Sequence, residues 1–374
     1  MGINNNALQW FRSYLSDRSQ YVEVNGIKSN KKYIRISVMQ GSILGPLLFL
    51  CYINDLWQST TLFTLMFADD TSAFKSGKNL NQLVQEMNNE INKMAVWFRA
   101  NKMSVNVTKT KYIIFRTRGK IINNDIQLCY NANEPGQPND ESLTYILDRV
   151  HDNHPDKNSR SYKLLGVYLD EHLSFNQHCN VLSNKLSKSL YCINKVKNLL
   201  SKKTLRLLYF ALFHPHINYC PIILNCTSQK NKTRIQKIQK KAIRVITKSG
   251  FNAHTEQLFC ENRILNLENI ILLQSALFMH SYIYNYAPSA FSDQWNYNNN
   301  RNIEYQLRNV NNDDLIVPFA RIELFKKSPL YFLPKTWNEL EHLRYQPNGF
   351  TLKWSLKCKF FNNWNVDHRN LPLL

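Results

Sequence analysis

Two adjacent carboxylates, Asp69 and Asp70, are the residues of this sequence best suited to hold a cation. An apolar run (61–66) precedes them and a half-apolar run (71–74) follows them, which predicts a β-hairpin with both aspartates at its tip. Adjacent carboxylates repel each other, so a nearby cation stabilises them. Mg²⁺ binds to few carboxylates together with substrate phosphates, and pairs of such ions catalyse phosphoryl transfer. Because aspartate is also common in solvated turns, the pair alone is compatible with a metal site or an ordinary turn.

The stretch 40–49, Gln-Gly-Ser-Ile-Leu-Gly-Pro-Leu-Leu-Phe, lies upstream of the aspartate pair. Gly41 and Gly45 allow the backbone to approach a base or phosphate closely, and Pro46 suits the first turn of a helix. We therefore expect an apolar helix over 47–56 that packs beneath the aspartate hairpin.

Taken in order, the stretches 40–46 and 67–70 resemble motifs B and C of the reverse transcriptases of jockey-like non-LTR retrotransposons. The resemblance implies an RNA-directed DNA polymerase that uses Mg²⁺, an RNA template, a DNA primer and deoxynucleotides. The primer 3′-hydroxyl would attack the nucleotide α-phosphate. It also implies that Asp69 and Asp70 hold metal. The residues implied to line the nucleotide and template are Gln40, Gly41, Ser42 and Gly45.

Two later segments resemble further motifs of the same family. Residues 102–116 resemble motif D, in which Lys109 matches a lysine that protonates the leaving pyrophosphate; an exposed turn lysine is an equally good interpretation. Residues 162–170 resemble motif E, the hairpin that holds the primer terminus. The resemblance implies that Leu165 and Gly166 belong to this primer grip, and Gly166 would permit close approach of the backbone to the primer. The apolar pattern by itself supports only a strand.

This sequence departs from other parts of the family pattern. Residues 10–20 resemble the linker between motifs A and B, so motif A, with its metal-binding aspartate, would fall before Met1. Val38-Met39 stands where the family has Val-Pro. We therefore expect a C-terminal fragment that is inactive as a polymerase by itself. A non-enzymatic nucleic-acid-binding remnant of a decayed retroelement is the alternative, and an unexpressed relic is a third.

The charge balance points to a polyanionic partner. The 374 residues carry a net charge of +20, which indicates nucleic acid first and an anionic membrane surface second. Residues 176–250 contain 15 Lys or Arg and no Asp or Glu, whereas solvated surfaces normally mix signs. We expect basic helices at 177–198, 202–213 and 231–248. The residues expected to contact the nucleic-acid backbone are Lys237, Lys240, Lys241 and Arg244.

Neither membrane insertion nor a zinc site is indicated. The longest apolar run, 43–53, is too short to span a bilayer, so we expect no membrane partner; the sequence does not distinguish nucleus from cytoplasm. The eight cysteines lack zinc spacing and are expected to be buried, reduced thiols.

The predicted fold class is α+β: a partial polymerase palm, an antiparallel sheet packed on helices, followed by a helical thumb and a mostly helical extension. Within the palm we expect a helix at 1–16 with its apolar side inward and a hairpin at 21–36. A helix at 79–101 should turn Asn81, Gln82, Asn88 and Asn89 outward. The predicted domains are 1–118 palm, 119–161 polar insertion without a site, 162–175 primer-grip hairpin, 176–250 basic thumb and 251–374 extension.

Overall fold

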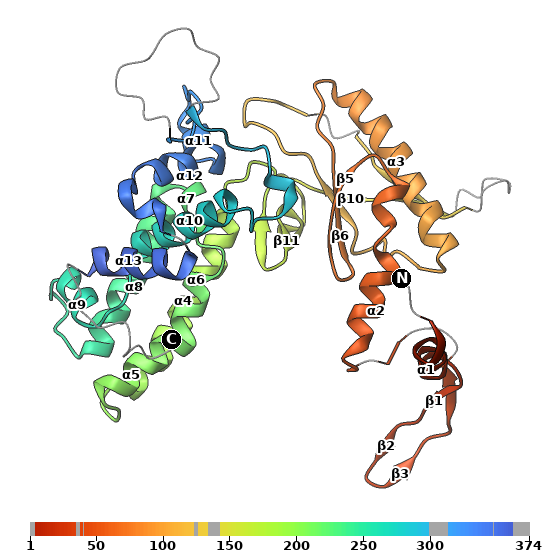
Figure 1. Ribbon diagram of the computed structural model, residues 1–374, viewed down its shortest axis with the longest axis horizontal. Helices are drawn as coiled ribbons and strands as arrows, with labels where there is room; N and C mark the ends of the chain where they lie inside the picture. The colour runs from red at the N-terminus through yellow and green to blue at the C-terminus, as the bar shows by residue number, and fades with distance from the viewer. Residues whose placement is uncertain are drawn as a thin grey trace. The chain divides into compact units, whose positions relative to one another are not determined.

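Helices and small antiparallel hairpins build the protein, as the computed structural model in Figure 1 shows. The structure describes residues 4–34, 38–39, 41–122, 126–133, 143–298, 313–346 and 348–361. It divides into two units, unit 1 (1–112 and 122–149) and unit 2 (113–121 and 150–374). The predicted α+β class is confirmed at this level. No helix in the described ranges is long and apolar enough to cross a membrane.

Among the described residues, unit 1 combines α-helices, one of them 21 residues long, with short hairpins. Its elements are α1 (Asn5–Leu15), β1 (Arg18–Gln20), β2 (Glu23–Val24), β3 (Ile27–Lys28), β4 (Lys32–Ile34), α2 (Leu44–Ile53), η1 (Leu56–Ser59), β5 (Phe63–Phe67), β6 (Asp70–Phe74), α3 (Leu80–Ala100), β8 (Cys129–Asn131) and β9 (Thr144–Ile146). The antiparallel pairs are β1–β4, β2–β3, β5–β6 and β8–β9. Two further strands, β7 (Lys111–Ile113) and β10 (Asp148–Val150), pair with each other.

The N-terminal segment has its predicted helix and Asn25-Gly26 turn, but the pairing predicted for the hairpin at 21–36 is wrong, because β4 pairs with β1 and β2 pairs with β3. The predicted burial of the helix is also not observed. Asn25 and Gly26 both have positive φ, 52° and 80°, and join β2 to β3 by a tight turn of the kind that matches strand twist. By contrast, α1 buries none of its residues, so the inward apolar side expected for this helix is wrong for the described chain. Trp10 instead stacks on Tyr14 of the same helix.

The β5–β6 hairpin rests on helices through one of its faces. Met66 and Ala73 pack against a cluster of buried apolar side chains from α2, η1 and α3, which includes Ile53, Leu56 and Met94. In Figure 1, α3 runs beside the two strands. The predicted helix beneath the hairpin is therefore present as α2, and it begins at Leu44.

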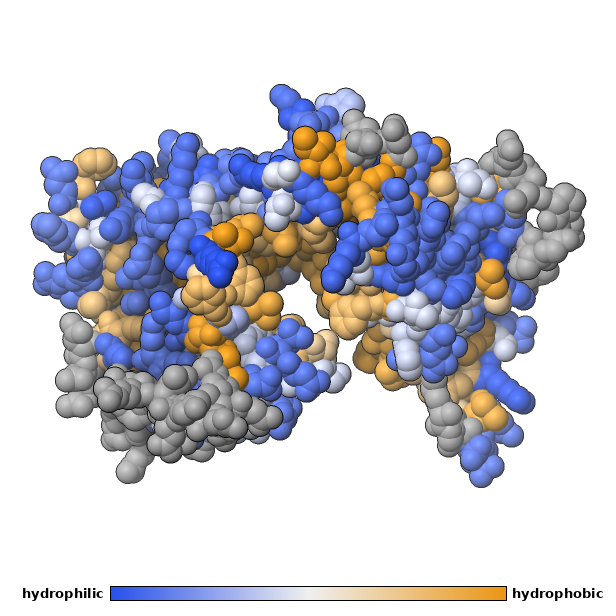
Figure 2. Space-filling model, turned by 90° about the horizontal axis from the view of Figure 1, so that it is seen from above, coloured by the Kyte–Doolittle hydropathy of each residue, from blue (hydrophilic) through white to orange (hydrophobic). Residues whose placement is uncertain are grey.

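The opposite face of this hairpin remains open. Phe63, Leu65 and Phe67 alternate with the packed residues along β5 and are about half exposed, as the two-residue period of a strand requires. Apolar patches interrupt the otherwise hydrophilic surface in Figure 2.

The start of β5 is anchored by a buried carboxylate on α3. Glu90 Oε2 accepts hydrogen bonds from Thr60 Oγ1 and Thr61 N, both at 2.7 Å, and Glu90 Oε1 accepts from Lys93 Nζ at 2.6 Å. Burial opposes ionisation, but Lys93 and these hydrogen bonds outweigh it and lower the pKa of Glu90 to about 2. Asn88 is likewise engaged: its Oδ1 accepts from Cys129 N, so its predicted outward position is wrong.

We expect Glu90→Gln to lower the free energy of unfolding by about 1.5–3 kcal/mol, because a charged acceptor of several hydrogen bonds is lost. Since the pKa of Glu90 is lowered on folding, its contribution is fully present above about pH 4.5 and is lost as pH falls toward about 2. Urea unfolding at several pH values measures both effects. Glu86→Gln on the same helix is the control and should change stability much less, because the Glu86 pair with Lys75 is more exposed to solvent. Equal losses of unfolding free energy in the two variants would contradict the role of Glu90 as an anchor.

Unit 2 contains a hairpin and is otherwise mostly helical. Its elements are η3 (Lys157–Arg160), β11 (Tyr162–Leu164), β12 (Val167–Leu169), α4 (Asn176–Val196), α5 (Lys202–Leu208), the π-helix η4 (Tyr209–Phe213), α6 (His214–Asn218), α7 (Ile222–Cys226), α8 (Gln229–Thr247), α9 (Thr255–Glu261), α10 (Leu267–Ile283), η5 (Ser289–Phe291), α11 (Glu323–Lys326), α12 (Pro329–Asn338), η7 (Glu341–Tyr345) and α13 (Gly349–Phe360). One apolar core, with residues such as Leu186, Ile243, Ala276 and Leu352, joins α4, α8, α10 and α13.

The three predicted basic helices are present, but the middle one is irregular. Residues 202–218 pass from α5 through a π-turn into α6. Pro215 lacks an N–H and therefore cannot complete a regular helix across this point. The wider turn accommodates the stacked, fully buried rings of Tyr209 and Phe213.

All eight cysteines are free thiols, as predicted. Cys192 and Cys220 are exposed, however, so the expectation that all eight are buried is wrong.

Candidate active site and nucleic-acid interface

Asp69 and Asp70 lie at the tip of the β5–β6 hairpin. Phe67 pairs with Asp70, so only Ala68 and Asp69 form the loop. Ala68 has a left-handed φ of 53°, a conformation that a non-glycine residue adopts only where its surroundings impose it. Both carboxylates are exposed. Within the described part of the chain they accept no hydrogen bond and form no ion pair, so their oxygens are accessible to a cation.

The turn before α2 is tightly packed. Ser42 Oγ donates to Met39 O and accepts from Gly45 N, both at 2.9 Å. A Cβ on Gly45 would lie 2.9 Å from Ser42 Oγ and 3.1 Å from Met39 O, so a larger residue there would displace the Ser42 side chain. Gly41 has φ of 83° with open space around it. Gln40 lies outside the described residues, and the nucleotide contacts of this turn stay a prediction.

Lys109 lies in a turn between α3 and β7. Its backbone N–H donates to the carbonyl of Asn106 at 3.1 Å and to Asn106 Oδ1 at 3.2 Å, a local motif typical of asparagine turns. The ammonium group is exposed and pairs with no described carboxylate. Both interpretations of Lys109 therefore stay open.

A stripe of unpaired cations runs along α8. The stripe consists of residues that lie three or four positions apart: Lys230, Arg234, Lys237, Lys241, Arg244 and Lys248. Lys240 lies beside it. The opposite side of α8 carries Ile235, Ile243 and Ile246, which are buried in the core of unit 2. Arg244 Nε donates to Ala253 O at 3.0 Å. None of the stripe residues pairs with a described Asp or Glu, so their positive charge is uncompensated.

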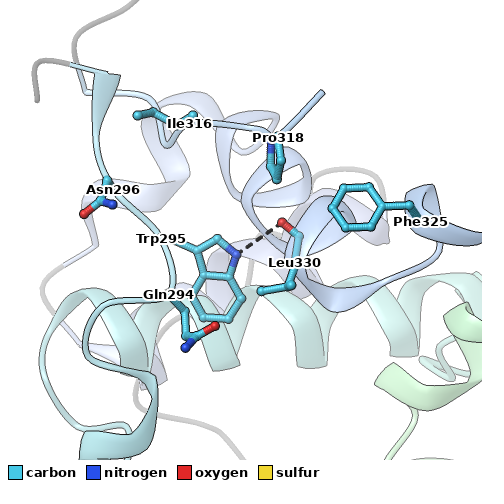
Figure 3. Close-up of a pocket in the computed structure, with 7 residues that line it drawn as sticks. All are labelled: Gln294, Trp295, Asn296, Ile316, Pro318, Phe325 and Leu330. Atoms are coloured by element: carbon cyan, nitrogen blue, oxygen red, sulfur yellow. Dashed lines mark hydrogen bonds between the residues drawn. The ribbon is translucent and has the colours of Figure 1, made fainter. Parts of the chain in front are cut away.

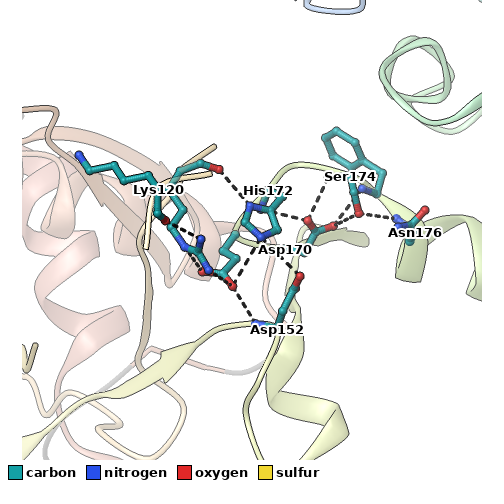
Figure 4. A network of polar contacts seen from close by, with 9 residues as sticks. Lys120, Asp152, Asp170, His172, Ser174 and Asn176 are labelled. Atoms are coloured by element: carbon teal, nitrogen blue, oxygen red, sulfur yellow. Dashed lines mark hydrogen bonds and ion pairs between the residues drawn. The ribbon is translucent and has the colours of Figure 1, made fainter. Parts of the chain in front are cut away.

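A network that sequence analysis did not identify joins three segments of unit 2 (Figure 4). The Arg116 guanidinium donates to both oxygens of Glu171, at 2.8 and 3.0 Å, and to Lys120 O at 2.7 Å. Glu171 also accepts from Asp152 N, and His172 Nε2 lies 3.5 Å from Asp152 Oδ2. Next to it, Asp170 accepts from the backbone N–H groups of 172, 174 and 175 at the start of α4. The consecutive Asp170-Glu171-His172 was the available signal in the sequence.

The network is an ion pair rather than a metal centre. Asp152, Glu171 and His172 bring their ligand atoms within 4.8 Å of one another. However, the guanidinium already occupies both oxygens of Glu171, and a cation added there would meet that positive charge. Burial opposes ionisation of Glu171, but the Asp152 N–H and Arg116 hold its pKa below the ordinary value.

A cavity of about 370 Å³ lies in the C-terminal part of unit 2 (Figure 3). Its walls include Trp295, Ile316, Pro318 and Phe325, and none of its lining residues is charged. The indole N–H of Trp295 donates to Leu330 O at 3.4 Å. The cavity therefore offers no titratable or nucleophilic group.

Residues 1–169 match the family described as reverse transcriptase (RNA-dependent DNA polymerase). The predicted resemblance to reverse transcriptases is confirmed. The matched segment contains the turn before α2, the aspartate hairpin, Lys109 and the β11–β12 hairpin. No solved structure matches the chain.

Two curated relatives come from mobile elements of Drosophila melanogaster. The RNA-directed DNA polymerase from mobile element jockey is 23% identical over 259 residues, which are 66% of this chain and 26% of the relative. The probable RNA-directed DNA polymerase from transposon BS is 25% identical over 272 residues, 69% of this chain and 27% of the relative. The chain thus spans about a quarter of the length of these relatives.

We expect Mn²⁺, used as a probe for hard divalent cations, to bind at the aspartate hairpin. The double variant Asp69→Asn/Asp70→Asn should lose the strongest binding event, because it removes both free carboxylates. Electron paramagnetic resonance of free Mn²⁺ measures the titration. Asp152→Asn is the control and should bind as the unaltered chain does. If Asp152→Asn loses the strongest binding event and the double variant retains it, the cation binds at the network of Arg116, Asp152, Glu171 and His172 instead.

Proposed function

We propose that this chain forms the palm and thumb of an RNA-directed DNA polymerase of the jockey-like non-LTR type. The observation that carries the proposal is the exposed, unpaired Asp69–Asp70 pair at a hairpin tip inside the segment that matches the reverse transcriptase family. Unit 1 would be the palm, the β11–β12 hairpin the primer grip, and α4 to α8 the thumb.

The donor set suits Mg²⁺ because both carboxylates are accessible oxygen ligands. Asp69 and Asp70 would hold the ion, which when bound would supply charge stabilisation for phosphoryl transfer. The turn formed by Gly41, Ser42 and Gly45, together with Gln40, would position the nucleotide and template. Lys109 would donate a proton to the pyrophosphate oxygen that leaves.

The described residues place no third carboxylate beside this pair, since the one group of three potential ligands among them is the Arg116 network. A two-metal site needs further negative charge to hold its ions. We therefore expect the chain by itself to extend a primer at no measurable rate, even where it binds template, primer and nucleotide.

The sharpest test separates binding from catalysis. A primer with a dideoxy end is annealed to an RNA template, and affinity is measured with and without the next deoxynucleotide and Mg²⁺. The correct nucleotide should tighten binding of the unaltered chain but not of Asp69→Asn/Asp70→Asn. Equal stimulation by correct and incorrect nucleotides would contradict a polymerase site. Primer extension that disappears in Asp69→Ala would contradict the expected inactivity.

A non-enzymatic nucleic-acid-binding remnant is the second candidate. The uncompensated charge of residues 176–250 favours it, as does the incomplete ligand set. Such a protein would bind the duplex while showing no response to nucleotide, so the same experiment distinguishes the two functions.

We expect nucleic-acid binding to depend steeply on salt through the α8 stripe. Changing Lys237, Lys240 and Lys241 to Gln should weaken binding similarly for all sequences. It should also reduce the magnitude of the slope of log K against log salt concentration by about 2–3, because each phosphate contact contributes about 0.9. Fluorescence anisotropy between low and high salt measures the slope.

A matched control removes three lysines that already have acidic partners. Lys28, Lys326 and Lys335 lie within 4 Å of Glu23, Glu323 and Glu339 respectively. Changing these three to Gln alters the net charge by the same amount as the stripe variant does. It should nevertheless leave the slope of log K against log salt concentration nearly unchanged. If both triple variants reduce the slope by the same amount, net charge rather than the stripe determines binding.

A further inference from the structure

The turn between β11 and β12 has an unusual backbone. Leu164 pairs with Val167, so Leu165 and Gly166 alone form the loop. Both have positive φ, 45° and 88°, as in the tight turns that glycine and asparagine favour. Leucine adopts this conformation at an energetic cost, so something outside the loop must hold it.

Tyr219 is the side chain that holds this turn. It lies 54 residues further along the chain, between α6 and α7, and its hydroxyl donates a hydrogen bond to Leu165 O. Its ring also covers Gly166: a Cβ there would lie 3.2 Å from Tyr219 Cε1 and 3.5 Å from the hydroxyl oxygen. One tyrosine therefore constrains both residues of the turn.

The backbone after Tyr219 is itself restricted. Cys220 has a left-handed φ of 47°, and the following Pro221 is buried. The ring is consequently presented from a defined position in the helical part of unit 2. Leu165 and Tyr219 nevertheless remain 43% and 51% exposed, so a ligand can still reach the turn.

We propose that Tyr219 is a positioning residue for the primer terminus: it holds the β11–β12 turn in the conformation that grips the primer. This inference rests on the proposed function. It also changes the interpretation of Gly166, because the space that a side chain would take is needed by the Tyr219 ring. The primer would then contact the turn from the side that Tyr219 leaves open.

The test compares two ligands of equal length, an RNA–DNA duplex with a recessed DNA 3′ end and a blunt duplex. Tyr219→Phe should weaken binding to the recessed end roughly fivefold, which is the effect expected from the loss of one hydrogen bond. Binding to the blunt duplex should change less than about twofold, since backbone contacts by the α8 stripe are unaffected. Tyr191→Phe is the control: this tyrosine on α4 is exposed, and its hydroxyl has no hydrogen-bond partner among the described residues.

A second pair of variants tests the contact with the ring. Gly166→Ala should weaken binding to the recessed end, and by a smaller factor in a Tyr219→Ala background, where the ring no longer obstructs the added methyl. Equal factors in the two backgrounds would overturn the inference. Thermal melting checks that each variant folds. If Tyr219→Ala does not fold, Tyr219→Phe, which retains the ring, still tests the hydrogen bond.

The outcomes distinguish a failure of this inference from a failure of the proposed function. If the unaltered chain binds recessed and blunt duplexes equally, the primer-grip assignment and the proposed function fail together. If it prefers the recessed end and Tyr219→Phe keeps that preference in full, the inference about Tyr219 fails alone.

Discussion

The antiparallel register of β5 and β6 is the constraint on which the candidate site depends. Because Phe67 pairs with Asp70, the loop contains only two residues and the carboxylates are adjacent at its tip. A shift by one residue would turn Met66 and Ala73 away from the helices beneath them, since side chains alternate between faces. Packing of these two residues on α2 and α3 therefore specifies the register and, through it, the position of Asp69 and Asp70.

Buried carboxylates act as anchors around the candidate functional segments, whereas exposed ones are available to a ligand. Glu90 ties the start of β5 to α3, and Glu171 ties the end of the β11–β12 hairpin to Arg116. Each is fully engaged by donors, which keeps its pKa below the ordinary value. Asp69 and Asp70 lack donors of this kind, and this contrast in environment assigns different roles to chemically similar side chains.

The cations divide in the same way. Arg116 is committed to a buried partner, whereas the α8 stripe faces solvent without acidic neighbours. Exposed like charges repel one another, so such a stripe is destabilising unless a polyanion compensates it. The proposed binding of a nucleic-acid backbone would supply that compensation, and the apolar side of α8 holds the stripe in place within the core of unit 2.

The sequence by itself determined the features that depend on local order. The aspartate hairpin, the tight turn at Asn25-Gly26, the long helix α3 and the basic helices all follow from turn residues and apolar periodicity, and each was predictable. The reverse transcriptase resemblance was also carried by short contiguous motifs. Tertiary structure alone decided which polar groups are buried and what they contact. Nothing local indicates that Glu90 meets Thr60, that Arg116 meets Glu171 or that Tyr219 covers Gly166, because each contact joins residues 30 to 55 positions apart. For the same reason the apolar side of α1 was misjudged: a helical pattern shows which residues could be buried, but only a packed neighbour buries them.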